Sequence, residues 1–330
     1  MSLASRVAAS RLAAACFAIA AAFTSTTALS QAYPSRPITL TVAYAGGGIS
    51  DIVLRVVNPR VSTALGQPVV IVNRPGGGGT IATDAVLAAG PDGYTLLVNG
   101  DQMVTSPHLM GKQVRYDLFR DLAPITRLFT VPFALIVNPA VPAANVAEFV
   151  ALAKSGKAKL TYSTPGTGTG NHLAMEYFKA LTGAELLHVP YKGAVQAITD
   201  VTAGRIDAIM FAPQTAVANI RAGKLRALAV SGATRAPSLP QGPTFAEAGM
   251  PTFDMGTTFG LLAPAGTPEP ILSRLHAEFT AALRVPEVKR QIEDAGTQVV
   301  ADTPAEFAAK LRTDYERNGR IIRDNHIQGE

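Results

Sequence analysis

Three short loops rich in glycine carry the residues best suited to binding a small anion. The first, at 45–51, joins a β-branched run to a helical pattern. Its unshielded backbone N–H groups lie at the start of a helix, where orphan amides and the helix dipole both favour negative charge. Either Ser50 or Asp51 is expected to cap that helix; the alternative is a tight turn that holds no ligand. The candidate ligand contacts in this loop are Gly46, Gly47, Gly48, Ser50 and Asp51.

The third loop, at 163–172, adds hydroxyl groups to the same kind of arrangement. Hydroxyls act as donors or acceptors, so they suit a small polar ligand. His172 could donate to that ligand or bond to neighbouring backbone, and we favour the structural role. The second loop, at 73–80, holds four glycines and Arg74, but it lacks the Lys-Ser/Thr pair of a P-loop. The candidate contacts in the third loop are Ser163, Gly166, Thr167, Gly168, Thr169 and His172.

Further candidates follow the predicted strands, because ligands of open α/β sheets bind beyond the carboxyl ends of strands. Asp101 is unexpected there, since it would repel a carboxylate. It either binds an ammonium or hydroxyl group of the ligand or caps the following helix, which is the commoner role. Phe211 lines either the cleft or the core. The candidates at strand ends are Tyr44, Asn99, Asp101, Gln102, Phe211 and Gln214.

The residue patterns of catalysis are missing from the sequence. It contains no G-x-S-x-G or H-E-x-x-H motif, and its five histidines are not spaced as metal ligands. We therefore expect no enzyme, no cofactor and no metal site. Lysines and arginines form no run, so we also expect no nucleic-acid partner.

Alternating strands and helices position these loops, which is typical of an α/β fold with parallel sheets. A helical face over 52–65 contains Pro59, which should kink or divide the helix. The pattern of strand, glycine loop and helix restarts near residue 160. Strands are predicted at 38–44, 69–72, 94–98, 160–163, 186–189, 208–211 and 225–230, and further helices at 173–181, 195–203 and 216–222.

Two crossings divide the chain into two lobes. The apolar stretch 123–138 is predicted to be one strand between the two units, with 259–263 as the return. Each of three tail helices, at 268–284, 286–295 and 304–325, begins with proline near its first turn. We expect this tail to pack on the first unit. Lobe 1 then comprises 33–132 plus 260–330 and lobe 2 comprises 133–259, each a mostly parallel sheet flanked by helices, with the ligand cleft between them.

The N-terminus has the pattern of a cleaved signal peptide. Arg6 and Arg11 precede an apolar run at 12–23, and Ser30 and Ala32 supply the small residues of a cleavage site. The run is shorter than the roughly 20 apolar residues of a membrane span. Removal of 1–32 also removes the single cysteine and lowers the formal charge from +5 to +3, because both arginines leave. We expect an exported, periplasmic protein.

These residues resemble the substrate-binding proteins of tripartite tricarboxylate transporters, the Bug-type extracytoplasmic receptors. The resemblance covers essentially all of the chain after residue 32. Gly46 and Ala212 depart from it, since the family usually has proline and often an acid at these positions. The matching blocks are Tyr33–Pro37, Gly47-Gly48 with Asp51, Asn73–Gly76, Pro91–Tyr94, Gly168-Thr169 with His172-Leu173, His188–Tyr191, Arg221–Ala229 and Ala263–Pro268.

The resemblance implies a two-lobed periplasmic-binding-protein fold, type II-like, that closes on a small carboxylate. The ligand would be a di- or tricarboxylate, an aromatic acid or an acidic amino acid, held by loops 46–50 and 163–169. The expected partners are this ligand and the integral-membrane permease subunits, and the receptor is expected to be a monomer. The alternative function is a ligand-sensing partner of a membrane sensor kinase.

Overall fold

The computed structural model describes residues 33–156, 159–191 and 193–328. The predicted signal peptide, 1–32, lies outside the described residues. From Arg36 onward the chain forms one compact unit, which contains two β-sheets and is described below. Among the described helices, none is both long enough and apolar enough to span a bilayer.

The first sheet has six strands in the order β11-β4-β10-β3-β1-β2. β1 pairs in parallel with β2 and β3, whereas β10 and β4 pair antiparallel with each other and with their outer neighbours β3 and β11. Buried side chains such as Ile38 and Leu40 fill its core. The strands are β1 (Ile38–Val42), β2 (Val69–Asn73), β3 (Thr95–Asn99), β4 (Leu122–Pro132), β10 (Gly256–Pro264) and β11 (Gln298–Val299).

The second sheet has five strands in the order β7-β6-β8-β5-β9. β6 pairs in parallel with β7 and β8, and β5 pairs antiparallel with β8 and β9. The α/β class with flanking helices is confirmed. The prediction of mostly parallel sheets was wrong, because the strands that cross between the sheets run antiparallel to their neighbours in each sheet. The strands are β5 (Ala134–Val137), β6 (Thr161–Thr164), β7 (Leu187–Pro190), β8 (Ala208–Phe211) and β9 (Arg226–Val230).

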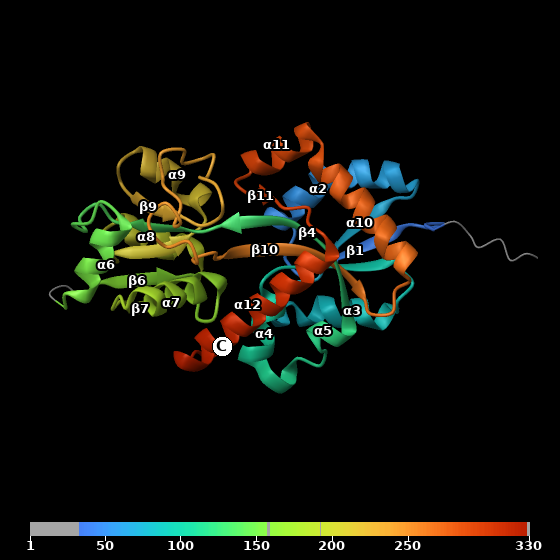
Figure 1. The fold of residues 1–330 in the computed structure, drawn as a ribbon, viewed down its shortest axis with the longest axis horizontal. Coiled ribbons are helices and arrows are strands. Elements are labelled where there is room, and N and C mark those ends of the chain that lie inside the picture. The colour runs from blue at the N-terminus through green and yellow to red at the C-terminus, as the bar shows by residue number, and fades with distance from the viewer. Residues whose placement is uncertain (1–32, 157–158, 192, 329–330) are drawn as a thin grey trace, which may run out of the picture. The chain divides into compact units, whose positions relative to one another are not determined.

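The predicted crossing strand at 123–138 is two strands, β4 and β5, with Phe133 between them. The N–H of Phe133 donates to Ser231 Oγ at 2.8 Å, and its carbonyl accepts from the Ser231 N–H at 2.7 Å. These bonds turn the chain out of the first sheet and into the second. β10 runs back beside β4 (Figure 1).

Helices cover both sheets. Pro59 lies inside α2 without dividing it, so the predicted division was wrong, and the helix starts three residues earlier than its apolar pattern suggested. Most of the tail packs on the first sheet as expected, with α10 and α11 against α2 and α12 against β4 and α4 (Figure 1). The end of the tail departs from the expectation, because Ile321, Ile322 and Ile327 join the core of the second sheet and α12 also contacts α7. The helices are α2 (Ile49–Leu65), α3 (Thr80–Ala89), α4 (Gln102–Met110), α5 (Leu118–Asp121), α6 (Val146–Lys154), α7 (Gly170–Thr182), α8 (Ala194–Thr202), α9 (Pro213–Arg221), α10 (Glu269–Arg284), α11 (Pro286–Asp294) and α12 (Pro304–Asp324).

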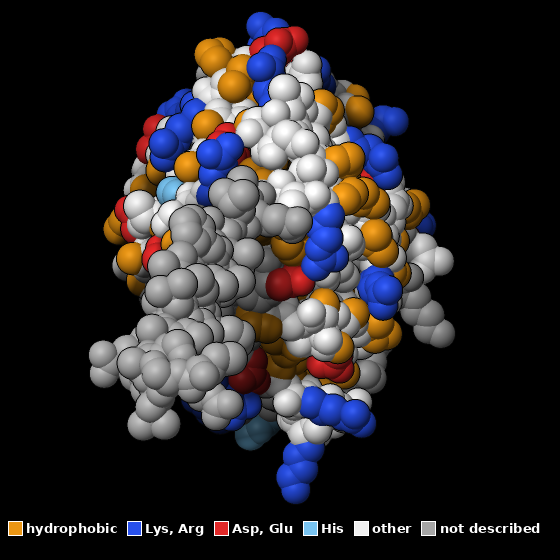
Figure 2. All heavy atoms as spheres, turned by 90° about the vertical axis from the view of Figure 1, so that its right-hand side faces the viewer, with side chains coloured by type: hydrophobic (Ala, Val, Ile, Leu, Met, Phe, Trp, Pro, Cys, Tyr) orange, Lys and Arg blue, Asp and Glu red, His pale blue; other side chains and the backbone are white. Residues whose placement is uncertain are grey.

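Charges of both signs are mixed with apolar side chains on the face that Figure 2 presents. Lysines and arginines are scattered over it rather than gathered into one stripe. Outside its grey atoms, this face therefore offers no field of a single sign.

The contact between Gly260 on β10 and Phe307 on α12 fixes the tail on the first sheet. A Cβ at Gly260 would overlap the ring of Phe307, which is fully buried. We expect Gly260→Ala to destabilise the protein by about 2 kcal/mol, because the ring must leave its position in a packed core. Urea unfolding measures this change. The cost should nearly vanish in a Phe307→Ala background, and an unchanged cost there would contradict the packing explanation.

Candidate functional site

A cavity of about 400 Å³ lies where α4 and the ends of the first sheet face the start of α7. Six predicted contacts line it: Tyr44, Asp101, Gln102, Thr167, Gly168 and Thr169. They come from loops that follow β1, β3 and β6, as expected for ligands bound beyond strand ends. The remaining lining residues are Gly78, Thr105, Ser106, Leu109, Met110, Gly170 and Thr257.

The third glycine loop is folded tightly against the start of α7. Thr169 is the N-cap residue, and its hydroxyl donates to the Gly166 carbonyl at 2.8 Å and accepts the His172 N–H at 3.4 Å. Among the described residues, the N–H groups of Gly170 and Asn171 have no acceptor. Such orphan amides at a helix N-terminus are donors for an anion. The backbone at Gly170 is therefore the candidate anion site of the cavity.

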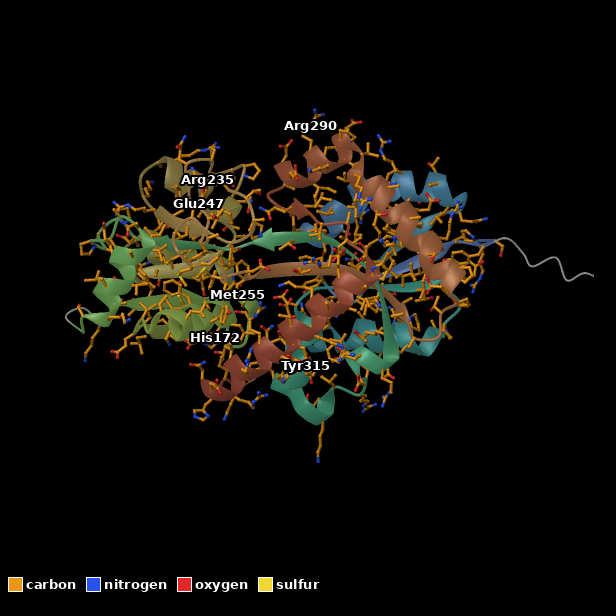
Figure 3. The ribbon with its side chains drawn as sticks, viewed as in Figure 1. His172, Arg235, Glu247, Met255, Arg290 and Tyr315 are labelled. Carbon is orange, nitrogen blue, oxygen red and sulfur yellow. The ribbon has the colours of Figure 1, made fainter. Side chains whose placement is uncertain are left out.

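Two stacked histidines hold this loop from behind. His172, labelled on α7 in Figure 3, is buried, and its ring centroid lies 4.0 Å from that of His188. His172 Nδ1 accepts the N–H of Gly168 at 3.0 Å, and His188 Nε2 bonds to Thr164 Oγ1 at 2.7 Å. His172 is not among the lining residues, and the structural role favoured from the sequence agrees with these bonds.

Burial keeps both rings neutral. Loss of solvation, followed by the charge of His188, lowers the pKa of His172 to about 4, and burial also lowers the pKa of His188. A neutral His172 leaves Nδ1 free of a proton, as its bond from Gly168 requires. Glu176, whose Oε1 lies 4.0 Å from His172 Nε2, accepts from the Tyr162 hydroxyl and from Lys179.

The first glycine loop is arranged differently from its prediction. Gly48 is the N-cap residue of α2 and no side chain caps it, so the expectation that Ser50 or Asp51 occupies the cap was wrong. Both residues lie inside the first turn, because the helix begins at Ile49. Asp51 Oδ2 accepts the Gly47 N–H at 3.2 Å and Arg55 Nε at 2.8 Å. The hydrogen bond from Arg55 lowers the pKa of Asp51.

The Gly47 N–H, which was predicted to be a donor for an anion, therefore donates to the Asp51 side chain instead. None of the loop's candidates is among the described residues that line the cavity, and Gly46, Gly47 and Gly48 are exposed. Gly46, Gly47, Gly48, Ser50 and Asp51 stay predictions as ligand contacts.

Five other candidates also lie outside the cavity lining. Asn99 Oδ1 accepts the Gly100 N–H at 2.8 Å, and Ser163 Oγ donates to the Ala197 carbonyl at 3.3 Å. Phe211 packs on the core of the second sheet, whereas Gln214 lies against Gly296 with a buried, unpartnered Nε2. Gly166 accepts from Thr169 behind the loop.

Sequence reasoning named Gln102 but missed the other residues on the same face of α4. Gln102, Thr105, Ser106 and Leu109 all line the cavity, and their spacing is that of one helix face. The polar residues on this face were a readable signal, but the sequence analysis assumed a helix after Asp101 without assigning its bounds or its faces. Asp101 begins α4 in helical conformation without a side-chain cap bond, which excludes the capping role for it.

Comparison with known proteins identifies the family of the chain. Residues 53–327 match the model of the tripartite tricarboxylate transporter family receptor. The chain belongs to this family. The receptor is 32% identical to protein BugT of Bordetella pertussis over 293 residues, which are 88% of this chain and 90% of BugT.

Solved structures of similar receptors share the fold. A receptor of Rhodopseudomonas palustris with adipate is 30% identical, with a TM-score of 0.72, and the match covers 90% of this chain and 99% of that one. MatC of the same species, with bound malate, is also 30% identical, with a TM-score of 0.68 and coverage of 88% and 100%. The two-lobed fold of periplasmic binding proteins is thereby confirmed. This chain is a periplasmic solute-binding receptor, not an enzyme.

The histidine stack gives the receptor a pH-dependent stability. His172 binds a proton more weakly in the folded protein than its usual pKa near 6.5, so the unfolded chain takes up more protons between pH 6.5 and 4. Stability is therefore lost as the pH falls. From pH 7 to pH 5 we expect His172 alone to account for about 2 kcal/mol of that loss.

Urea unfolding at the two pH values checks this. His172→Gln keeps an acceptor without a titrating ring, so its stability should fall less between pH 7 and 5. The exposed His326 is a matched control, and His326→Gln should behave as the parent. An equal pH dependence of the unfolding free energy in all three proteins would show that the pKa of His172 is not lowered in the folded protein.

Proposed function

We propose that this receptor captures a small carboxylate in the cavity at the start of α7 and delivers it to the permease subunits of a tripartite tricarboxylate-type transporter. The observation that carries the proposal is the Gly170 amide, the first of α7, which lines the cavity together with the hydroxyl-bearing residues Thr105, Ser106 and Thr257. The adipate and malate bound by two similar receptors support the ligand class.

The energetics require more than the helix terminus. A micromolar ligand needs about 8 kcal/mol. A helix N-terminus contributes roughly 0.3 to 2 kcal/mol toward an anion. The hydroxyl and amide groups on α4 and β10 must therefore hydrogen-bond the rest of the ligand, and Leu109 and Met110 must cover its apolar carbons.

We also keep the lobe boundaries as a proposal: 33–132 with 260–330, and 133–259. Phe133 supports the first boundary, since both its backbone bonds go to Ser231 of the second lobe. The second boundary, between 259 and 260, has weaker support from the return strand. The pairing of β10 with β4 already begins at Gly256, before that boundary.

Export through cleavage after Ala32 completes the proposal. The mass of receptor purified from the periplasm should correspond to a chain that begins at Tyr33. A mass that retains Cys16 would contradict cleavage at this site.

Thermal shift with a panel of acids tests the ligand class. At 100-fold excess over Kd, ligand binding stabilises by about 2.7 kcal/mol, and for a chain of this size we expect a rise of roughly 5 °C in Tm. Aliphatic di- and tricarboxylates and aromatic acids are compared with their methyl esters, which keep the carbon skeleton without the charge. Equal stabilisation by the esters would contradict the anion site.

Two further arms make this test specific. Leu109→Trp should fill the cavity and abolish the shift, whereas the exposed Leu187→Trp on the second sheet should leave it unchanged. Proteoliposomes that contain the permease subunits should take up the stabilising acid only when the receptor is added. Uptake that is independent of the receptor would contradict delivery.

A further inference from the structure

The cavity at α7 has an unusual charge for a carboxylate site. Among its described lining residues, Asp101 is the one charged side chain, so the anion site is bordered by an acid and by no lysine or arginine. Asp101 Oδ1 is buried and has no hydrogen-bond partner. A buried polar atom without a partner is rare in native proteins and calls for a ligand or another explanation.

The carboxylate of Asp101 lies at the anion site itself, with its other oxygen, Oδ2, nearest to α7. A Cβ at Gly170 would overlap Asp101 Oδ2, so the carboxylate approaches the first residue of α7 directly. The backbone donors of α7 and the Asp101 acceptor therefore lie at adjacent points of one cavity. A carboxylate with a donor group on its neighbouring carbon matches both.

The surrounding charges do not neutralise Asp101. Arg317 and Lys310 on α12 both pair with Asp314, at 2.9 and 3.0 Å, and are thus engaged elsewhere. Burial raises the pKa of Asp101 to about 7, and Asp314 adds to this rise, while the Thr257 hydroxyl and Arg317 oppose it. Burial and the nearby Asp101 also raise the pKa of Tyr44, which stays a neutral neighbour.

We propose that Asp101 determines specificity by accepting a hydrogen bond from an ammonium group on the carbon next to the ligand's carboxylate. The proposal rests on the proposed function and narrows its ligand class to amino acids. A zwitterion places its carboxylate at Gly170 and its ammonium at Asp101, so each unpartnered group of the cavity gains a partner. A plain dicarboxylate would leave Asp101 unpaired beside a second negative charge.

Matched acids that differ at one carbon test this inference. Succinate, malate and aspartate carry hydrogen, hydroxyl and ammonium at C2; glutarate, 2-hydroxyglutarate and glutamate repeat the series with one more methylene. Phenylacetate, mandelate and phenylglycine repeat it with an aromatic body. In calorimetric titrations at pH 8, we expect the amino member of the series that fits to bind at least tenfold tighter than the unsubstituted member.

Substitution of Asp101 should reverse this order. Asp101→Asn keeps the shape but removes the charge, so we expect tenfold weaker binding of the amino acid and tighter binding of the unsubstituted acid. Asp101→Ser provides a second, smaller variant, and urea unfolding shows that each variant is folded. The matched control is Asp84→Asn, which removes an exposed carboxylate on α3 and should change neither affinity.

The pH dependence gives an independent measure. Between pH 8 and 5.5 Asp101 gains a proton, so the preference for the amino acid should fall in the parent and stay constant in Asp101→Asn. Tight binding of unsubstituted acids that Asp101→Asn leaves unchanged would overturn the inference while the proposed function stands. Failure of every carboxylate to bind parent and variants would overturn both.

Discussion

The pairing of β4 with β10 is the constraint on which both sheets depend. These two strands carry the chain out of the first sheet and back into it, side by side over nine paired positions. Because they run against each other, each sheet must accept antiparallel strands among its βαβ units. The same pairing places the loops after β3 and β6 opposite each other. A cavity lined by α4 and α7 follows from this topology.

Helices and strands could be predicted from the sequence where the apolar pattern and the glycines that flank it indicate the same boundaries. The strand at 208–211 was predicted with its observed bounds, and the proline-started tail helices within one or two residues. The break at Phe133 could not be foreseen, because it depends on bonds to Ser231, about a hundred residues away in the sequence. The prediction that Pro59 kinks or divides the helix gave that residue too much weight. A proline removes one N–H from a helix, and packing of α2 against the tail outweighs that loss.

The candidate site shows the same division between local and tertiary information. The third loop was identified from its glycines and hydroxyls, and Thr167 to Thr169 line the cavity. The first loop is likewise rich in glycine, yet the Asp51 side chain takes up its Gly47 amide. That difference lies in one hydrogen bond, which composition does not reveal. The cavity-facing side of α4 was missed because which face of a helix lines a cavity depends on how the helix packs, and that is not written in its local sequence.

The bond from Gly168 to His172 bears on how fast and how tightly a ligand binds. It is a bond within the fold itself, so the loop's glycines lose conformational freedom when the chain folds. Association then bears a smaller entropic penalty, since ordering of side chains and loops is a main term opposing binding. The loop before α7 is in this sense preorganised for binding.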